Sequence, residues 1–295
     1  METIRNPVEY AGAQVVGAAR GIATAYHSLQ HIQDTIHSPA PAVQHIGIAD
    51  IGAALKEGFE DFGAYRSDVV FLCAIYAAVG LVLARLAFGL DMLPLVFPLA
   101  SGFALIGPFA AIGLYEMSRR REQGLPVSWA SAFDVVHAPA AGAILVLGLM
   151  LIAIFLVWLY VAWLIFAHTL GPAEPASLQM FVNAVFFTRA GWTMIGLGCG
   201  VGFLFALAAM TISLVSFPLL IDRDVGLDTA IRTSARAVWE NPGAMAAWGL
   251  IVAGSLVAGS IPLFIGLVVV VPVLGHATWH LYRRLVAPVA YAPPA

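Results

Sequence analysis

Histidine is the residue type in this sequence best suited to hold a metal ion or a haem. His276 and His280 are four residues apart near the C-terminus, and His27 and His31 have the same spacing near the N-terminus. Two imidazoles at this spacing share one face of a helix, but a metal site normally needs a third or fourth ligand from another element. No recognisable ligand motif accompanies either pair. His276 and His280 are therefore only weak metal-ligand candidates.

The alternative to metal binding is that both pairs are polar helix surface. His276 and His280 lie close in sequence to Trp279, Tyr282 and Arg283, and such a cluster can anchor the end of a helix at a membrane interface. The N-terminal pair then lies on a solvated helix face. No histidine falls near the centre of an apolar segment, as a haem ligand between helices would, and no nucleophile or phosphate-binding motif is present. We expect no cofactor and no catalytic residues, and hence no enzyme.

The elements that must position these residues are membrane helices. Hydrophobic residues make up 61% of the 295 residues, charged residues only 11%, and the mean hydropathy is +0.89. A typical soluble domain is about 25% charged. The formal net charge of −3 suggests no electrostatic partner, and both cysteines, Cys73 and Cys199, lie in apolar runs. Composition therefore excludes a soluble domain, a disordered chain, a nucleic-acid binder and a disulfide scaffold.

The apolar segments predict an all-α protein with six transmembrane helices. A helix needs about 20 apolar residues to cross the hydrocarbon core. The apolar stretch between Glu240 and Arg283 would form a helix about twice that length, so we predict a hairpin of two spans that turns near residues 259–262. The predicted spans lie in 69–88, 94–115, 139–170, 192–221 and the two halves of 241–282.

The basic residues predict the orientation of these helices. Nearly all of the 14 Lys and Arg residues fall before the first span or in the loops that follow the second, fourth and sixth spans. Arg189 lies in a loop on the opposite side. Because cytoplasmic loops of membrane proteins are enriched in Lys and Arg, both termini are expected to be cytoplasmic.

Three segments of about 15 residues have helical amphipathic spacing and precede predicted hairpins. They are 48–62, 125–136 and 227–238. We predict cytoplasmic amphipathic helices that lie in the interface plane, each followed by a transmembrane hairpin, which gives three possible repeated units. The alternative is that cytoplasmic loops look amphipathic by chance.

The first of these amphipathic segments has a well-defined predicted division between faces. Its apolar face is expected to consist of Ile48, Ile51, Leu55, Phe59 and Phe62. Its acidic residues are expected to face away, on a solvated surface, and these are Asp50, Glu57, Glu60 and Asp61.

The N-terminal segment is predicted to be a separate amphipathic helix that ends near Ser38. Its apolar residues alternate spacings of three and four, with Val15, Ile22 and Leu29 among them, and Ala at many of the positions between. This is the pattern of a helix that contacts another helix closely. We therefore divide the chain into an N-terminal cytoplasmic helix and linker (1–45), a six-span membrane domain (46–284) and a cytoplasmic tail (285–295).

Small residues in the fourth predicted span indicate a second helix-contact face. Gly196, Gly198, Gly200 and Gly202 contain two overlapping Gly-xxx-Gly spacings, which let a neighbouring helix approach closely. We predict that the protein is a non-catalytic accessory, assembly or organising component. Besides membrane lipid, its partner would be a membrane-protein complex or another copy of the chain, and not a nucleic acid.

Prolines in the second and sixth predicted spans support an alternative function. Such residues kink helices, and kinked helices can line a path for a solute. The alternative is a carrier or lipid-handling protein for an apolar or neutral solute. These prolines are Pro94, Pro98 and Pro108, and Pro262 and Pro272.

Two strings resemble a known family. Residues 102–120, which begin GFALIGP and end SRR, and residues 272–283, PVLGHATWHLYR, together resemble a bacterial family of predicted integral membrane proteins classed as a domain of unknown function. The resemblance covers roughly residues 46–284 and not the N-terminal helix. It implies a bacterial inner-membrane location and no established activity. Some relatives carry the label cytochrome c oxidase subunit I, which would imply at most association with a respiratory complex, because the intramembrane histidines of an oxidase are absent.

Overall fold

The computed structural model describes residues 34–64, 93–128, 131–132, 134–135, 138–171, 177–262 and 265–287. The predicted N-terminal helix, with His27, His31 and the candidate contact residues Val15, Ile22 and Leu29, lies outside these residues. The predicted span 69–88 also lies outside them.

The described residues form helices joined by short connections, with one isolated β-bridge between Val43 and Val286. A 3₁₀ turn at Leu93–Leu95 precedes the first helix of the apolar bundle. The α-helices are α2 (Ile48–Ala64), α4 (Val96–Ala110), α5 (Ile112–Glu122), α6 (Ala141–Thr169), α7 (Leu178–Phe187), α8 (Arg189–Ser213), α9 (Ser216–Asp222), α10 (Leu227–Glu240), α11 (Pro242–Ser260) and α12 (Leu267–Leu285).

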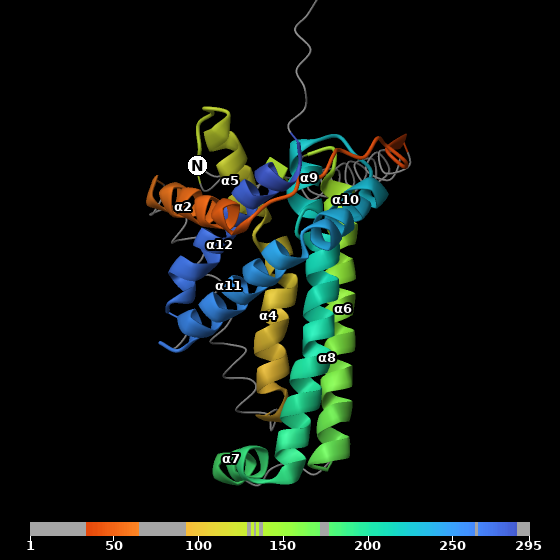
Figure 1. The fold of residues 1–295 in the computed structure, drawn as a ribbon, viewed down its shortest axis with the longest axis vertical. Helices are drawn as coiled ribbons and strands as arrows, with labels where there is room; N and C mark the ends of the chain where they lie inside the picture. Colours follow the sequence, from red (N-terminus) through yellow and green to blue (C-terminus); the bar gives the residue numbers. More distant parts are fainter. Residues whose placement is uncertain are drawn as a thin grey trace, which may run out of the picture.

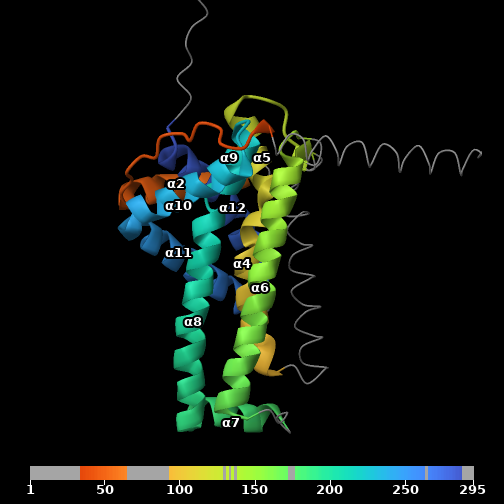
Figure 2. The same ribbon diagram turned by 90° about the vertical axis from the view of Figure 1, so that its right-hand side faces the viewer.

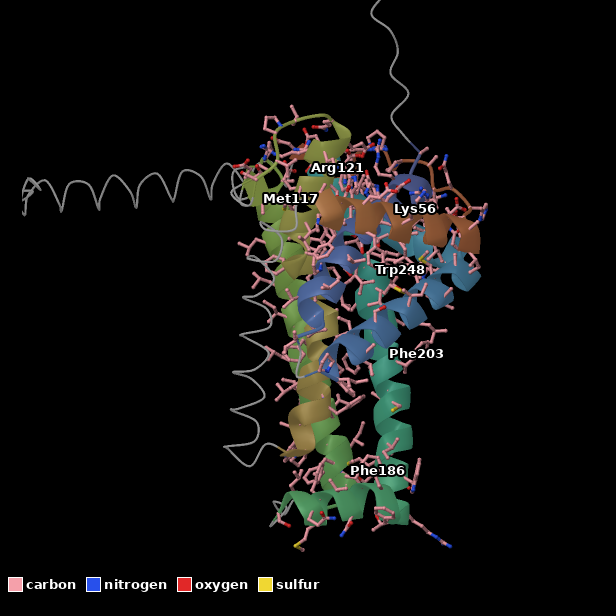
Figure 3. The ribbon with its side chains drawn as sticks, turned by 90° about the vertical axis from the view of Figure 1, so that its left-hand side faces the viewer. Lys56, Met117, Arg121, Phe186, Phe203 and Trp248 are labelled. Carbon is pink, nitrogen blue, oxygen red and sulfur yellow. The ribbon has the colours of Figure 1, made fainter. Side chains whose placement is uncertain are left out.

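The helices divide the molecule into a long apolar bundle and a charged end. Helices α6 and α8 run side by side and antiparallel, with α4 against them, and α7 lies across one end (Figures 1 and 2). Helices α2, α5, α9 and α10 gather at the other end. Figure 3 shows Lys56 and Arg121 at that charged end and Phe186 at the opposite one. Charged side chains and the longest apolar helices are therefore separated along the molecule.

Three described helices are long and apolar enough to cross a membrane: α6, the segment Arg189–Asp222 that joins α8 to α9, and α11. The predicted number of six is not confirmed. The second predicted span is divided into α4 and α5 at Ala111, three residues after Pro108. The sixth corresponds to α12, which begins at Leu267 and ends in the polar sequence around Arg283.

Glycine and aromatic residues set the spacing between α4 and α6. A Cβ atom at Gly102 would overlap the ring of Phe155, and one at Gly148 would lie 2.5 Å from the ring of Phe109. Each glycine therefore makes room for an aromatic ring of the facing helix, which is how apolar helices pack closely. Trp158 is buried in the same interface, and its indole nitrogen donates a hydrogen bond to the Ser101 hydroxyl at 3.0 Å.

Two of the three predicted amphipathic segments are helices, α2 and α10. The middle segment, 125–136, contains no α-helix in the part that the structure describes, so the prediction of a helix there is not confirmed. Helix α5 ends where Gly124 adopts a φ of +68°. Arg120 binds the loop that follows α5. Its guanidinium donates hydrogen bonds to the carbonyl of Pro126 at 3.3 Å and to the carboxylate of Asp134 at 2.6 Å.

Helix α2 packs on the core through a face that agrees only in part with the predicted apolar face. Ile51 of that face is 1% exposed, and Leu55 and Phe62 pack against the core, whereas Ile48 and Phe59 are 64% and 57% exposed. Ala54, Gly58 and Asp61 are also buried, because the backbones of α2 and α12 approach closely at Gly58. The acidic residues of α2 are correspondingly not all on a solvated surface, because Asp61 is only 4% exposed.

Residues 38–47, which include the linker predicted to end at residue 45, lie against α10 and the end of α12. Ser38 accepts from Gly226 N at 2.9 Å through its hydroxyl and from Thr229 Oγ1 at 2.9 Å through its carbonyl. The side chain of Asn241 accepts from the amide of Ile46 at 2.8 Å. These contacts fix the segment that leads into α2.

We predict that Gly58→Ala destabilises the protein by about 1–3 kcal/mol, the usual cost of inserting a methyl group into a packed interface. A Cβ atom there would lie 2.7 Å from the backbone nitrogen of Ala277 and 2.8 Å from the carbonyl oxygen of Val273. Thermal unfolding in detergent measures the effect. Gly52 is the matched control on the same helix, since its Cβ would meet nothing within 4 Å, and Gly52→Ala should be neutral or stabilising. Equal effects of the two substitutions would contradict the close packing of α2 on α12.

Candidate functional site

A polar cleft lies where α2, α5 and α12 meet. Its volume is about 430 Å³. It is lined by both acidic and basic side chains, together with a histidine and a serine. These are Glu57, Glu60, Asp61, Ser118, Arg121, Glu122, His280, Arg283 and Arg284.

Asp61 of α2 is the buried centre of this cluster. Its Oδ2 atom accepts a hydrogen bond from Ser118 Oγ at 2.5 Å and lies 2.9 Å from His280 Nε2. Its Oδ1 atom accepts from Arg121 Nη1 at 2.6 Å. A buried carboxylate is tolerated only when it is paired and hydrogen-bonded, and here α5 and α12 supply the partners.

The surroundings of Asp61 favour its charged form. Burial alone would raise the pKa of the carboxyl group, but hydrogen bonds from His280 and Ser118 and the charges of the histidines outweigh it, so the pKa is lowered. Asp61 is therefore ionised at neutral pH.

Glu57, one helical turn before Asp61, makes the second link to α12. Its two carboxylate oxygens accept from Arg284 at 2.7 and 2.9 Å, and its Oε2 atom lies 3.1 Å from His280 Nδ1. The hydrogen bond from Arg284 is the main cause of a lowered pKa of Glu57. The ring of His280 thus lies between two carboxylates of one helix.

His276 lies deeper, one turn before His280, and is fully buried. Its Nδ1 atom lies 2.7 Å from Ser118 Oγ, while Nε2 has no hydrogen-bond partner of normal geometry among the described residues. The structure thus brings the two metal candidates to one place, where their nitrogens contact a hydroxyl and carboxylates. Within the described ranges no group of three or more His, Cys, Asp or Glu side chains is placed to hold a metal ion.

The remaining polar residues at the end of α12 contact α5 and α9. Glu122 accepts from the indole of Trp279 at 3.1 Å and pairs with Arg283 at 2.9 Å. Asp222 accepts from the hydroxyl of Tyr282 at 2.6 Å. These side chains therefore bind helices of the same chain, in addition to any contact with the membrane interface.

The chemistry that this arrangement supports is proton exchange. Ser118 is only 1% exposed and its hydroxyl hydrogen is directed at Asp61, so it is not placed to attack a substrate. Glu57, His280, Asp61, Ser118 and His276 instead form a continuous series of short polar contacts from the cleft into the protein interior. Such groups can hold protons and redistribute them.

The four candidate contact glycines of α8 lie in different surroundings. A Cβ atom at Gly202 would lie 3.1 Å from the ring of Trp158 on α6. At Gly196, Gly198 and Gly200 it would meet no described atom within 4 Å. Gly202 therefore packs against α6 of the same chain, whereas the other three glycines have no described neighbour on the side of their Cβ positions.

The sequence of the central helices matches the model of one protein family over part of the chain. Residues 96–222 match the family described as a predicted integral membrane protein (DUF2189). The match confirms the resemblance carried by residues 102–120 and runs from α4 to α9. The second string, residues 272–283, lies outside it, as do α2 and α12. The family description assigns no function and mentions no oxidase, so the cytochrome c oxidase label is unconfirmed.

No curated protein and no solved structure matches the chain. The protein is thus a predicted integral membrane protein with apolar helices and no assigned function. Of the polar cluster, the family match includes the α5 residues Ser118, Arg121 and Glu122.

Sequence reasoning found the two histidines of this cluster and missed their partners. The prediction that Asp61 lies on a solvated face is wrong, because Asp61 is buried where α2 contacts α5 and α12. The pattern that indicates the buried face is the spacing of Ala54 and Gly58, because small residues four apart are typical of a close helix contact. Asp61 lies three residues after Gly58 and therefore shares this face.

We predict that Asp61→Asn destabilises the protein by about 2–3 kcal/mol, because Arg121 and His280 then lose a buried counter-charge. Unfolding in detergent at neutral pH measures the loss. Glu60→Gln is the matched control, because Glu60 is largely exposed and its ion pair with Lys56 is long, at 3.9 Å. This substitution should change the free energy of unfolding by less than about 0.5 kcal/mol. A loss for Asp61→Asn no greater than for this control would show that Asp61 is not the centre of the cluster.

We also predict that stability falls in acid. Since the pKa values of Asp61 and Glu57 are lowered by folding, their contribution is complete above the ordinary values of 3.8 and 4.5. It is lost as the pH falls through the lower values of the folded protein. Unfolding temperatures between about pH 6 and about pH 3 should decrease less in the Glu57→Gln, Asp61→Asn double variant than in the wild type. An identical decrease would exclude these two carboxylates as the cause.

Proposed function

We propose that this protein is a non-catalytic accessory or organising component of a bacterial inner membrane that acts through helix contacts. The observation that carries the proposal is the open face of α8. Gly196 and Gly200 are exposed and one helical turn apart, and the large apolar residues Leu197, Phe203 and Leu204 are also exposed nearby. A helix of another chain could approach closely along such a face.

The two Gly-xxx-Gly spacings of α8 have separate uses in this proposal. Residues four apart share a face of a helix, and residues two apart lie on nearly opposite faces. Gly202, against Trp158, belongs to the face that packs on α6. Gly196 and Gly200 belong to the other face, and that face remains for a partner.

The proposed topology has six membrane crossings with both termini in the cytoplasm. Arg189 begins α8 beside α7 at one end of the bundle, whereas α5 and α10, which contain arginines, and α9, which Arg223 follows, lie at the other end (Figure 1). The positive-inside rule then places α2, α5, α9 and α10 at the cytoplasmic surface. Helix α7 lies at the outer surface, where exposed Phe186 and Phe187 suit the lipid headgroup region.

The N-terminal helix is the second proposed contact. Val15, Ile22 and Leu29 would form its apolar seam toward a partner, and residues 35–47 attach it to α10.

We predict that the tagged full-length protein, extracted from its native membrane in mild detergent, carries a stoichiometric membrane-protein partner. Gly196→Leu with Gly200→Leu should reduce the recovered partner at least about tenfold, since a close helix contact then loses its packing. Quantitative mass spectrometry measures the partner. Gly254→Leu on α11 is the matched control, because Gly254 is also exposed with no described atom within 4 Å of its Cβ position, and should retain the partner.

Removal of residues 1–33 tests the second contact in the same assay. A loss of partner only in this variant would assign the interface to the N-terminal helix. Recovery of the wild-type protein alone, or with lipid only, would refute the accessory role.

The alternative function is a carrier for an apolar or neutral solute. It is favoured by Pro108, three residues before the boundary between α4 and α5, and by Pro272, which lies inside the continuous helix α12. Broken or proline-containing membrane helices can line a path for a solute. Purification without a protein partner, together with lipid or solute transfer by the reconstituted protein, would support this alternative over the first.

A further inference from the structure

The hairpin formed by α11 and α12 is apolar, but one of its two helices is short. Between Glu240 and Arg283 the chain contains no Asp, Glu, Lys or Arg, so the hairpin suits the hydrocarbon core of a membrane. In α12, however, only the nine residues 267–275 precede the polar sequence that begins at His276. At about 1.5 Å per residue these nine extend about 14 Å. This is about half of the hydrocarbon thickness of about 30 Å, so this part of α12 is too short to cross.

The end of α11 lies at the same depth as the start of α12, because the two backbones meet there. A Cβ atom at Gly266 would lie 2.7 Å from the Cα atom of Gly259, and one at Gly259 would lie 2.9 Å from the side chain of Leu267. Helix α11 has 19 residues and is therefore about 28 Å long. To end at the depth where α12 begins, it has to slant, and Figures 1 and 3 show it slanted relative to α8.

The other end of α12 lies at the membrane surface, because α2 packs on it. Gly58 of α2 lies against the backbone of α12 at Val273 and Ala277. The neighbouring side chains of Lys56 and Glu60 are 79% and 56% exposed, and exposed charged groups are costly inside a membrane. Only the part of α12 before Val273 is then left for the hydrocarbon core. The turn of the hairpin accordingly lies beside the middle of α8, far from α7 (Figures 1 and 3).

The exposed side chains at the turn suit acyl chains better than water. Ile261 and Ile265, on either side of the turn, are 78% and 68% exposed. Leu250 and Val257 are exposed along α11. A hairpin that crossed the membrane would place this turn at the outer surface, where polar and amphipathic residues are usual.

The described part of the protein is broader at its charged end than at the opposite end. The hairpin and α2, α5, α9 and α10 gather at the charged end, whereas α4, α6, α8 and α7 make up the other (Figures 1 and 2). At Gly196 and Gly200 of α8, a Cβ atom would meet no described atom within 4 Å. The described residues therefore occupy more space in the half of the membrane that adjoins the charged end.

We propose that the α11–α12 hairpin is a wedge confined to the cytoplasmic leaflet, where its exposed apolar residues contact acyl chains, and that the protein consequently prefers membrane with a convex cytoplasmic surface. Material inserted into one leaflet expands that leaflet, and convex bending relieves the crowding. The wedge rests on the proposed orientation, in which the charged end is cytoplasmic. It replaces the fifth and sixth crossings of the proposed topology. Both termini stay cytoplasmic, because the hairpin returns to the side from which it enters.

Labelling of single cysteines tests the position of the hairpin. Full-length protein with Cys73 and Cys199 replaced by alanine carries Ile261→Cys, and a membrane-impermeant maleimide is added to right-side-out and to inverted membrane vesicles. Phe187→Cys on α7 is the control for the outer surface and Lys56→Cys on α2 for the cytoplasmic one, since both native side chains are exposed. From either side, Ile261→Cys should react at least about tenfold less than the control for that side, because a thiol in apolar surroundings stays protonated.

Reaction of Ile261→Cys from the outer side would overturn the proposal, because the hairpin would then cross the membrane. Reaction from the cytoplasmic side would also overturn it, because the turn would then lie in water. Ile265→Cys provides the same measurement if the first variant does not fold. Reaction of Lys56→Cys from the outer side would overturn the cytoplasmic assignment.

Reconstitution of the purified Lys56→Cys variant tests the curvature preference. Vesicles of phosphatidylethanolamine and phosphatidylglycerol are prepared at diameters of about 50 nm and about 400 nm, which differ strongly in curvature. Maleimide labelling before and after solubilisation gives the fraction of molecules whose charged end faces outward. The ratio of outward to inward molecules should be at least about threefold higher in the small vesicles, whose outer leaflet is convex. Equal ratios would overturn the preference. Since no other protein is present, this result is independent of whether a partner is recovered from the native membrane.

Discussion

The contact between α2, α5 and α12 depends on one buried carboxylate of α2. Asp61 is only 4% exposed, and a carboxylate removed from water must be compensated by groups that are held in place. Here α5 supplies Ser118 and Arg121 and α12 supplies His280. Three helices from distant parts of the sequence are thereby fixed relative to one another, and the pairs formed by Glu57 and Glu122 extend the same arrangement to the rest of α12.

The apolar bundle is held together by different means. Between α4 and α6 the specific contacts are the fits of Gly102 against Phe155 and of Gly148 against Phe109. In lipid, apolar side chains gain little by leaving their surroundings, so close packing of small residues against rings has to supply the attraction. The fold is thus specified by ion pairs at the charged end and by close steric packing in the apolar bundle.

The sequence predicts the helical fold and the apolar segments, because composition and uninterrupted hydropathy report directly on membrane helices. The sequence does not predict those features that depend on contacts between distant segments. Periodicity placed Phe59 on the buried face of α2, yet backbone contact at Gly58 leaves room only for small residues. The helix expected at 125–136 is not seen in its described residues, where Arg120 binds the loop. The partners of His276 and His280 come from other helices, and no pattern local to α12 reveals them.

The bridge between Val43 and Val286 has a consequence for how the chain is threaded through a bilayer. Two points of a chain that are joined at one face of a membrane must be separated by an even number of crossings. Helix α6, the segment Arg189–Asp222 and α11 are three candidates, an odd number. If all three cross, parity requires at least one more crossing between residues 43 and 286, and a single β-bridge therefore constrains the membrane topology of the whole domain.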